Sequence, residues 1–151
     1  MRVSAKSDYA IRAAVELAAA GDGPTKGERI AQAQEIPPNF LENILLDLRH
    51  AGIVASRRGA EGGYWLARPA AEISLADIIR AVDGPLANVR GMRSEQVSYA
   101  GSAAPLRDVW VAVRASLRGV LEHVTLADLA SGDLPEQVRV LAADPDAWTA
   151  H

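Results

Sequence analysis

The chain has 151 residues, of which 49% are hydrophobic, a net charge of −3 and no cysteine. This length predicts one domain, or one domain with an added oligomerisation element, and the lack of cysteine excludes disulfides and thiolate metal ligands. No apolar run approaches the roughly 18 residues of a membrane span, and the N-terminus lacks a secretory-type apolar segment, so we expect a cytoplasmic protein. Residues 1–70 hold nine Lys/Arg against eight Asp/Glu, and residues 71–151 hold seven against eleven, which permits a local basic surface in the first half without requiring one.

Two helices and a turn are predicted at the start of the chain. Apolar residues with helical spacing cover residues 4–20, and a Gly-Asp-Gly-Pro sequence then breaks the helix. The next four residues have the form of a capping box, in which the side chains of Thr25 and Glu28 satisfy exposed amides at a helix start. A short helix is therefore expected to about Ala33, followed by a turn.

The next helix, over residues 39–50, is amphipathic. One face carries apolar side chains at i, i+3, i+4 and i+7, the spacing of a helix that packs on a core; they are Leu41, Ile44, Leu45 and Leu48. The opposite face begins with Asn39, Glu42 and Asn43, which are polar groups able to contact base edges in DNA. Asn39 and Glu42 have an alternative role as helix caps. Leu46, on the same face, could contact a thymine methyl or pack on the following hairpin.

A β-hairpin is predicted after the glycine at position 52. Two short runs rich in Val, Ile, Tyr and Trp flank a tip that holds Arg57, Arg58 and three glycines, the first of them Gly59. An arginine at such a tip can reach a phosphate or a narrow minor groove, although many exposed arginines simply occupy a solvated turn. A recognition-type helix followed by a hairpin predicts a winged helix-turn-helix domain over residues 1–83. Three side chains near the start of the first helix are expected to contact phosphates: Ser4, Lys6 and Tyr9.

The chain beyond the hairpin predicts one more short helix and then a loop. A capping box at Ser74 and Asp77 opens a helix that runs through Ala81 and ends at a Gly-Pro pair. Residues 84–105 are rich in Gly, Ser and Ala and have little periodicity, which predicts a long exposed loop. Loops of this length in compact proteins are usually functional or mobile.

A heptad repeat begins at residue 106 and predicts a long helix. Its apolar seam consists of Leu106, Trp110, Val113, Leu117, Val120 and Val124. Such a seam serves dimerisation or packs on its own domain, and we prefer dimerisation because the winged domain already has an apolar set to close its core. A short final helix capped by Thr125 completes the dimerisation region, 106–131. The acidic tail, 132–151, is expected to be loosely held or packed across the dimer.

Catalytic motifs are not found. The three histidines are scattered, and the sequence lacks Walker, nucleophile-elbow, His-x-x-x-His and dinucleotide-binding patterns. We therefore predict a mainly α fold with a small β-hairpin wing that is not an enzyme and holds no metal or cofactor.

Six motifs, in order, resemble the Rrf2 family of transcriptional regulators. They are Met-Arg-x-Ser-x-Lys-x-x-Tyr-Ala (1–10), Pro-x-Asn-Phe-Leu-Glu-Asn (37–43), Leu-Arg-x-Ala-Gly-Ile-Val (48–54), Arg-Gly-x-x-Gly-Gly-Tyr-x-Leu-Ala (58–67), Ile-Ser-Leu-x-Asp-Ile-Ile-x-Ala-Val-Asp-Gly (73–84) and Val-Thr-Leu-Ala-Asp-Leu (124–129). The resemblance implies a bacterial homodimer that binds a palindromic double-stranded DNA operator. It also implies base contacts from one end of the amphipathic helix and minor-groove contacts from the wing; the residues concerned are Asn39, Phe40, Glu42 and Asn43, and Arg58 and Gly59.

One feature of the family does not carry over to this chain. Many members hold an iron–sulfur cluster with three cysteines from the loop before the dimerisation helix, and the corresponding positions here are approximately Met92, Ser98 and Ala104. None of these side chains replaces a thiolate. Asp8 matches a carboxylate ligand that some relatives supply from the partner chain, but one carboxylate cannot hold a cluster alone. We expect no cluster, and Asp8 is expected to be a helix N-terminal charge.

The signal that controls such a protein is open at this point. One hypothesis is a small-molecule effector between the 84–105 loop and the long helix, near Tyr99 and Trp110, with simple packing of Trp110 as the alternative. A second hypothesis is a constitutive repressor, or one that senses a partner protein docked on the acidic C-terminal half. The alternative function, from a different class, is a winged-helix protein-interaction module that has lost DNA binding.

Overall fold

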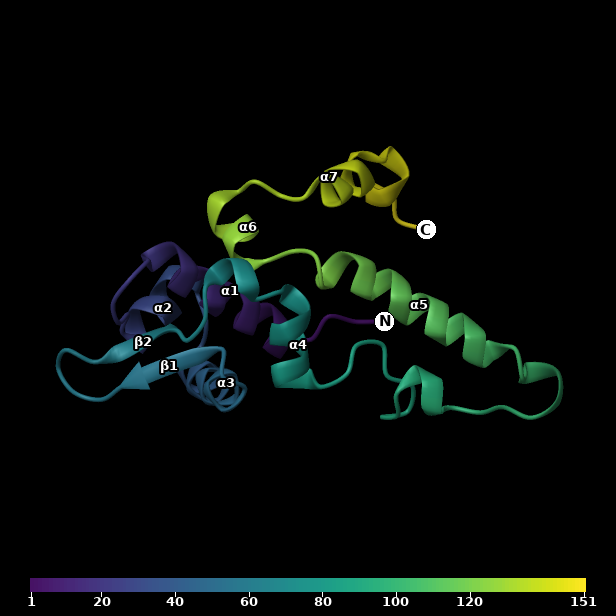
Figure 1. Ribbon diagram of the computed structural model, residues 1–151, viewed down its shortest axis with the longest axis horizontal. Helices are drawn as coiled ribbons and strands as arrows, with labels where there is room; N and C mark the ends of the chain where they lie inside the picture. The colour runs from purple at the N-terminus through teal and green to yellow at the C-terminus, as the bar shows by residue number, and fades with distance from the viewer.

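The computed structural model describes all residues, 1–151. Its helices are α1 (Ala5–Ala20), α2 (Gly27–Gln34), α3 (Pro38–His50), α4 (Leu75–Asp83), α5 (Leu106–Leu121), α6 (Leu126–Ser131) and α7 (Glu136–Ala143). Strands β1 (Val54–Arg57) and β2 (Gly63–Leu66) form an antiparallel hairpin. Figure 1 shows a head that contains α1 to α4, the hairpin and α6, with α5 extending away from it. No helix has both the length and the apolar character needed to cross a membrane.

Helix α1 is the centre of the head. Its inward face is made of small residues, and Ala10, Ala13 and Ala14 are completely buried. Helices α2, α3, α4 and α6 and strand β2 all pack against α1. Side chains at a helix contact set the distance between helix axes, so this alanine face lets several elements share one core. The core cluster of 17 buried residues joins these elements.

Helix α3 has the predicted buried face. The four apolar positions at helical spacing are all at most 2% exposed: Leu41, Ile44, Leu45 and Leu48. The predicted caps are wrong, because the residue before the helix is Pro37 and no side chain caps its start. Pro38 occupies the first turn, where a missing N–H leaves no hydrogen bond unmade. Asn39 and Glu42 are therefore exposed helical residues with no capping role.

The predicted capping box before α2 is also wrong. Helix α2 begins at Gly27, and no side chain caps it. Thr25 instead pairs with Tyr64 of β2 through two backbone hydrogen bonds, each with an N–O distance of 2.8 Å. The backbone N–H and C=O of Thr25 thus bond to β2, and this pairing takes the place of the predicted cap at the start of α2. This bridge ties the hairpin, the wing of the fold, to the loop between α1 and α2.

Gly63 makes the bridge possible. It lies at the start of β2 opposite Arg57, with φ +145°, and a Cβ there would lie 2.6 Å from the carbonyl oxygen of Thr25. Only glycine allows both this φ and this approach of two backbones.

The capping boxes of α4 and α6 are confirmed. Ser74 and Asp77 exchange the two expected hydrogen bonds, as do Thr125 and Asp128. However, α6 packs on α1 with Leu126 completely buried, so α6 belongs to the head and not to a separate dimerisation region. It is also not the last helix, because α7 follows.

The segment 84–105 is less exposed than predicted. It contains two short 3₁₀ turns, and Leu86, Ser94 and Val97 are buried. The Ser94 hydroxyl donates to the carbonyl oxygen of Ala87 over 2.8 Å. Individual buried side chains hold this loop in place, and they do not recur at a helical or strand period. The sequence pattern therefore did not predict that the loop is partly buried.

Helix α5 has two different faces. One face meets its own loop: the Trp110 indole donates to the Tyr99 hydroxyl over 3.0 Å, and Arg114 pairs with Glu95 over 3.1 Å. No residue of α5 is fully buried. The predicted seam needs two corrections, because Trp110 serves the loop and Val124 lies beyond the helix end, 4% exposed in the core. The face turned away from this loop, named here the open face of α5, carries Val109, Ala112, Val113, Ser116, Gly119 and Val120, none of them fully buried.

Candidate DNA-binding surface

The outer face of α3 is exposed at each position predicted to contact bases. Asn39, Phe40, Glu42 and Asn43 are all exposed, and Phe40 retains 58% of its surface. The Asn43 side chain donates only a long hydrogen bond, 3.3 Å, to the backbone of Asn39, so its amide remains available to a ligand.

The start of α1 lies beside this face. Lys6 pairs with Asp47 of α3 over 2.7 Å. The Tyr9 ring meets the Phe40 ring edge-on with centroids 6.3 Å apart, and the Arg12 guanidinium lies 4.8 Å from the Tyr9 centroid. The structure therefore brings Lys6 and Tyr9 together with α3, as a DNA-contacting surface requires.

Ser4 lies elsewhere. Its side chain caps α1 by accepting from the Ser7 N–H, and its hydroxyl donates to Asp83 at the end of α4. Asp8 lies in the first turn of α1 and pairs with Arg12 over 2.9 Å, in agreement with its expected role as a helix N-terminal charge.

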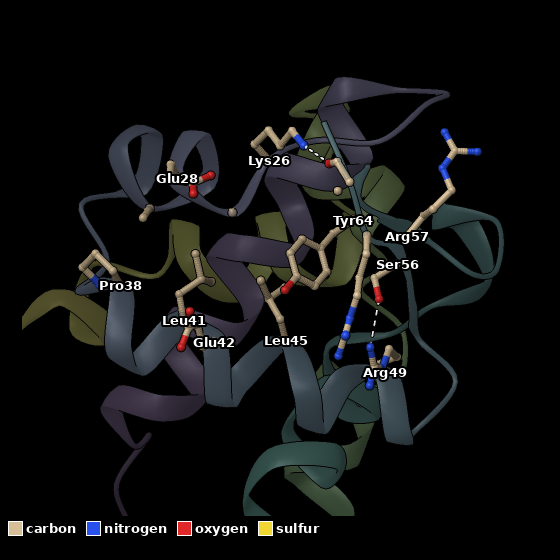
Figure 2. Close-up of a pocket in the computed structure, with 15 residues that line it drawn as sticks. Lys26, Glu28, Pro38, Leu41, Glu42, Leu45, Arg49, Ser56, Arg57 and Tyr64 are labelled. Carbon is tan, nitrogen blue, oxygen red and sulfur yellow. Dashed lines mark hydrogen bonds between the residues drawn. The ribbon is translucent and has the colours of Figure 1, made fainter. Parts of the chain in front are cut away.

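A groove of about 400 Å³ separates α3 from the wing. Figure 2 shows Leu41 and Leu45 of α3 and Tyr64 of β2 lining it. Its basic side chains outnumber its acidic ones, Glu28 and Glu42; they are Lys26, Arg49, Arg57 and Arg58. A protein with a net negative charge thus has a locally basic groove beside the exposed face of α3.

Two basic residues of the groove were not predicted. Lys26 donates to the Gly59 carbonyl oxygen over 2.7 Å, and Arg49 donates to the Ser56 hydroxyl over 3.0 Å; Figure 2 marks both bonds. At the wing tip, Arg57 donates to the carbonyl oxygen of Glu61, whereas Arg58 is exposed and makes no hydrogen bond or ion pair within the chain. Arg58 is the groove arginine most free to meet a phosphate.

Leu46 does not line the wing groove. It retains 42% of its surface and lines a separate hollow with Lys6, Phe40 and Asn43, on the α1 side of α3. Of the two predicted roles for Leu46, packing on the wing is therefore excluded.

A charged cluster joins the head to α5. Glu122, just after α5, accepts from Arg118 over 2.8 Å and also pairs with Arg80 of α4. The hydrogen bonds from Arg118 and then Arg80 lower the pKa of Glu122 to about 2. The same contact raises the pKa of Arg118. The cluster is a polar link between the head and the end of the long helix.

We expect Glu122→Gln to destabilise the protein above pH 5 and to have progressively less effect as the pH falls towards 2. A carboxylate whose folded pKa lies below its unfolded value stabilises the fold when ionised, and this contribution is lost as pH falls from about 4.5 towards 2. Denaturation midpoints at pH 7, 4 and 2.5 measure it. Glu72→Gln, at an exposed position with no ion pair, is the control. Parallel pH profiles for the two variants would contradict the assignment.

Comparison with known proteins gives consistent matches. The model of the Rrf2 family, described as "Iron-dependent Transcriptional regulator", matches residues 3–132. A Mycobacterium tuberculosis protein named as an HTH-type transcriptional regulator is 54% identical over 145 residues, 95% of this chain and 90% of that protein. The HTH-type transcriptional regulator CymR of Bacillus subtilis is 37% identical over 132 residues, 87% of this chain and 91% of CymR.

Solved structures agree with these relatives. The structure of CymR, the global cysteine regulator of B. subtilis, superposes with a TM-score of 0.74 at 37% identity and covers 87% of this chain and 98% of that one. IscR of T. potens superposes with a TM-score of 0.69 at 33% identity and covers 100% and 93%.

The iron in the family description does not fit the residues of this chain. There is no cysteine, and no group of three or more His, Asp or Glu side chains lies close enough to hold a metal ion. At the positions that match cluster ligands, Met92 pairs with Val89 through two backbone hydrogen bonds, and Ser98 and Ala104 are exposed. Iron–sulfur clusters need thiolate or imidazole ligands, so this loop cannot hold one.

The family match spans most of the chain, and the two solved structures superpose on 87% and 100% of it. The chain belongs to the Rrf2 family of bacterial winged-helix proteins, and it is a DNA-binding transcriptional regulator and not an enzyme.

Proposed function

We propose that the protein is a homodimer that binds a palindromic operator, with α3 in the major groove and the wing on the flanking backbone or minor groove. The observation that supports this most directly is the exposed polar face of α3 beside a basic groove. The N-terminal part of a recognition helix is the part that reaches base edges, and Asn39, Glu42 and Asn43 lie in that part of α3. A DNA-bound regulator of this kind works in the cytoplasm.

The residues divide into two kinds of contact. Asn39 and Asn43 suit adenine, and Glu42 suits the cytosine amine, so these side chains would read sequence. Lys6, Arg49, Arg57 and Arg58 suit phosphates, which fix position but carry no sequence information. Tyr9 holds Phe40 in place by ring contact, so both contribute apolar contact rather than charge. Gly59 lets the backbone at the wing tip approach DNA closely.

The open face of α5 supports dimerisation. Val109, Val113 and Val120 recur at helical spacing on a helix with no fully buried residue, and Val109 is 51% exposed. Small residues between the valines allow a second helix to approach closely. One head alone covers too short a stretch of duplex, whereas a twofold dimer reads two half-sites about one helical turn apart.

Arg58→Ala should weaken operator binding and flatten its dependence on salt. Each lost phosphate contact reduces the slope of log affinity against log salt by about 1, and each protomer contributes one such contact. Asn43→Ala is the contrasting variant: it should keep the salt slope and lose about 1–3 kcal/mol of discrimination at one base pair. Fluorescence titrations on operator and scrambled DNA at several salt concentrations measure both. A flat salt response with no preferred sequence would instead favour the protein-interaction module.

A small-molecule effector is the second part of this proposal. The predicted residues Tyr99 and Trp110 bond to each other, and neither lines the groove beside the wing or the cavity near the N-terminus. A cavity of about 600 Å³ lies instead where the N-terminus meets Pro85 and the end of α5. Ile79, Leu117 and Leu121 contribute apolar walls, and Asp83 and Ser4 contribute a polar end. Cavities of this size hold small ligands, and this one touches both head and dimer helix.

A ligand at 100 times its dissociation constant should stabilise the protein by about 2.7 kcal/mol, a rise in melting temperature of roughly 5–10 °C for a chain of this size. A thermal-shift screen of metabolites with an apolar body and a cationic or hydroxyl end measures this. Ile79→Trp, which fills the cavity away from the DNA surface, is the matched variant. Hits that persist in Ile79→Trp, or no hits at all, would argue against the cavity as an effector site.

A further inference from the structure

We propose that the C-terminal segment, residues 133–151, packs on the partner's α5 and forms part of the dimer interface. The proposal rests on the homodimer proposed above. It concerns a part of the chain beyond the family match, which ends at residue 132. The partner surface is a second copy of this chain.

Apart from one hydrogen bond from Asp133 to the adjacent Ser131, the segment makes hydrogen bonds and ion pairs only within itself. Helix α7 folds against a 3₁₀ turn, Pro145–Trp148, and the Trp148 indole donates to the carbonyl oxygen of Ala142 over 2.6 Å. Arg139 pairs with Asp133 and Glu136. No hydrogen bond or ion pair joins residues 133–151 to any residue before Ser131. Isolated helices shorter than about 12 residues are marginal in water, so α7 needs a surface to pack on.

The segment also exposes large apolar side chains. Val140 is 60% exposed, Leu141 53% and Trp148 79%. A cluster of exposed apolar residues on a short segment marks an interaction surface. Nothing in the segment's own chain covers these side chains.

Helix α7 stands at the edge of the open face of α5. A Cβ on Gly119 would lie 3.9 Å from the Gln137 side chain, and Figure 1 shows α7 lying over the C-terminal half of α5. Leu141 follows Gln137 by one helical turn, so it lies on the same side of α7. A helix that packs on the open face of α5 therefore meets Leu141 as well.

Twofold symmetry identifies which part of the partner's α5 would contact α7. An operator with half-sites about 34 Å apart needs the two heads apart, and α5, about 24 Å long, keeps them apart if the two copies run antiparallel. In that arrangement the N-terminal half of the partner's α5 lies beside the C-terminal half of this one. That half carries Val109, which lies on the open face and is 51% exposed, and Val109 would meet α7.

Charge supports the same pairing. Residues 84–121 contain five arginines and two acidic residues, whereas residues 133–151 contain four acidic residues and one arginine. Arg93 and Arg107 have no ion pair within their own chain. Complementary charge of this kind favours association of the acidic segment with the basic half of the partner.

The size of the interface also requires more than α5. One face of α5 is a strip about 24 Å long and about 10 Å wide, which is well short of the roughly 800 Å² that each partner contributes to a typical stable interface. Packing α7 and Trp148 on the partner enlarges the apolar contact on both sides of the twofold axis.

Cross-linking tests the proposal directly, because a chain without cysteine accepts single labelled positions. Val109→Cys with one affinity tag is co-expressed with Leu141→Cys carrying another, and the mixture is treated with a short bis-maleimide. A product that carries both tags is expected. Arg139→Cys, on the opposite side of α7, is the matched control and should give several-fold less product. No doubly tagged product, or equal yields from Leu141→Cys and Arg139→Cys, would overturn the proposal.

A full-chain variant provides the second measurement. Leu141→Asp should raise the dimer dissociation constant at least tenfold in sedimentation equilibrium, with an unchanged circular dichroism spectrum. A wild-type protein that sediments as a monomer would remove the homodimer and this proposal together. A stable wild-type dimer unaffected by Leu141→Asp would overturn only the role of the C-terminal segment.

Discussion

Val113→Asp should convert the protein to a monomer and reduce operator affinity at least about 100-fold. Val113 lies at the middle of the open face of α5, where a dimer would bury it, and a buried carboxylate without a partner is strongly unfavourable. A monomer loses the effective concentration that links its two heads, which is typically worth a factor of about 10² to 10⁴ in affinity. Sedimentation equilibrium and operator titration measure the two effects.

Ala115→Asp is the matched control for this result. Ala115 is exposed, lies two residues away on the same helix and is outside the open face, so the same charge should leave mass and affinity unchanged. Val113 is a better position than Leu117, which also lines the cavity near the N-terminus. An unchanged mass for Val113→Asp would refute the assignment of the open face as the dimer contact.

Gly63→Ala should release the wing and destabilise the fold by about 3 kcal/mol. A side chain at this φ costs about 1–3 kcal/mol, and the Cβ would displace the Thr25 carbonyl oxygen and its two backbone hydrogen bonds, each worth about 0.5–1.5 kcal/mol. Urea denaturation measures the loss. Because the wing carries Arg57 and Arg58, operator affinity should fall as well, by at least about tenfold if two phosphate contacts per protomer lose their position.

Gly23→Ala is the control that separates the backbone strain of a positive φ from the steric clash with Thr25. Gly23 also has a positive φ, +99°, but a Cβ there meets nothing within 4 Å, and it lies in the loop after α1. It should cost only the conformational strain and leave DNA affinity intact. Equal effects of the two variants on DNA affinity would show that the bridge to Thr25 does not hold the wing.

The parts of the structure that sequence predicted well depend on local patterns. The buried face of α3, the hairpin and the capping boxes of α4 and α6 follow from residues within one or two turns of each other. The pattern at Thr25 and Glu28 was misread because the partner of Thr25 is Tyr64, 39 residues later, and no local pattern reveals such a bridge. The bridge between Thr25 and Tyr64 forms instead of the helix cap that the local sequence predicted.

The candidate site shows the same limit. The exposed residues of α3 and the wing tip were identified from spacing and from the family resemblance, and the structure exposes them. Lys26 and Arg49 were missed, because each enters the groove only after α2, α3 and the wing come together. The heptad repeat that includes Trp110 correctly predicted a helix. Periodicity alone cannot distinguish a helix face that packs on the chain's own loop from one that contacts a second copy of the chain.

In the proposed binding mode, the pairing of Lys6 with Asp47 would affect how the protein finds its operator in a genome. A regulator competes for its operator against a vast excess of random DNA, and purely electrostatic attraction favours random sites as much as the correct one. Here Asp47 satisfies one phosphate-seeking lysine in the free protein, and Glu28 and Glu42 offset part of the positive groove. In the proposed binding mode, random DNA would therefore gain little from this part of the surface, and we expect the protein to dissociate quickly from wrong sites. A sequence that also satisfies Asn39 and Asn43 would retain the protein longer.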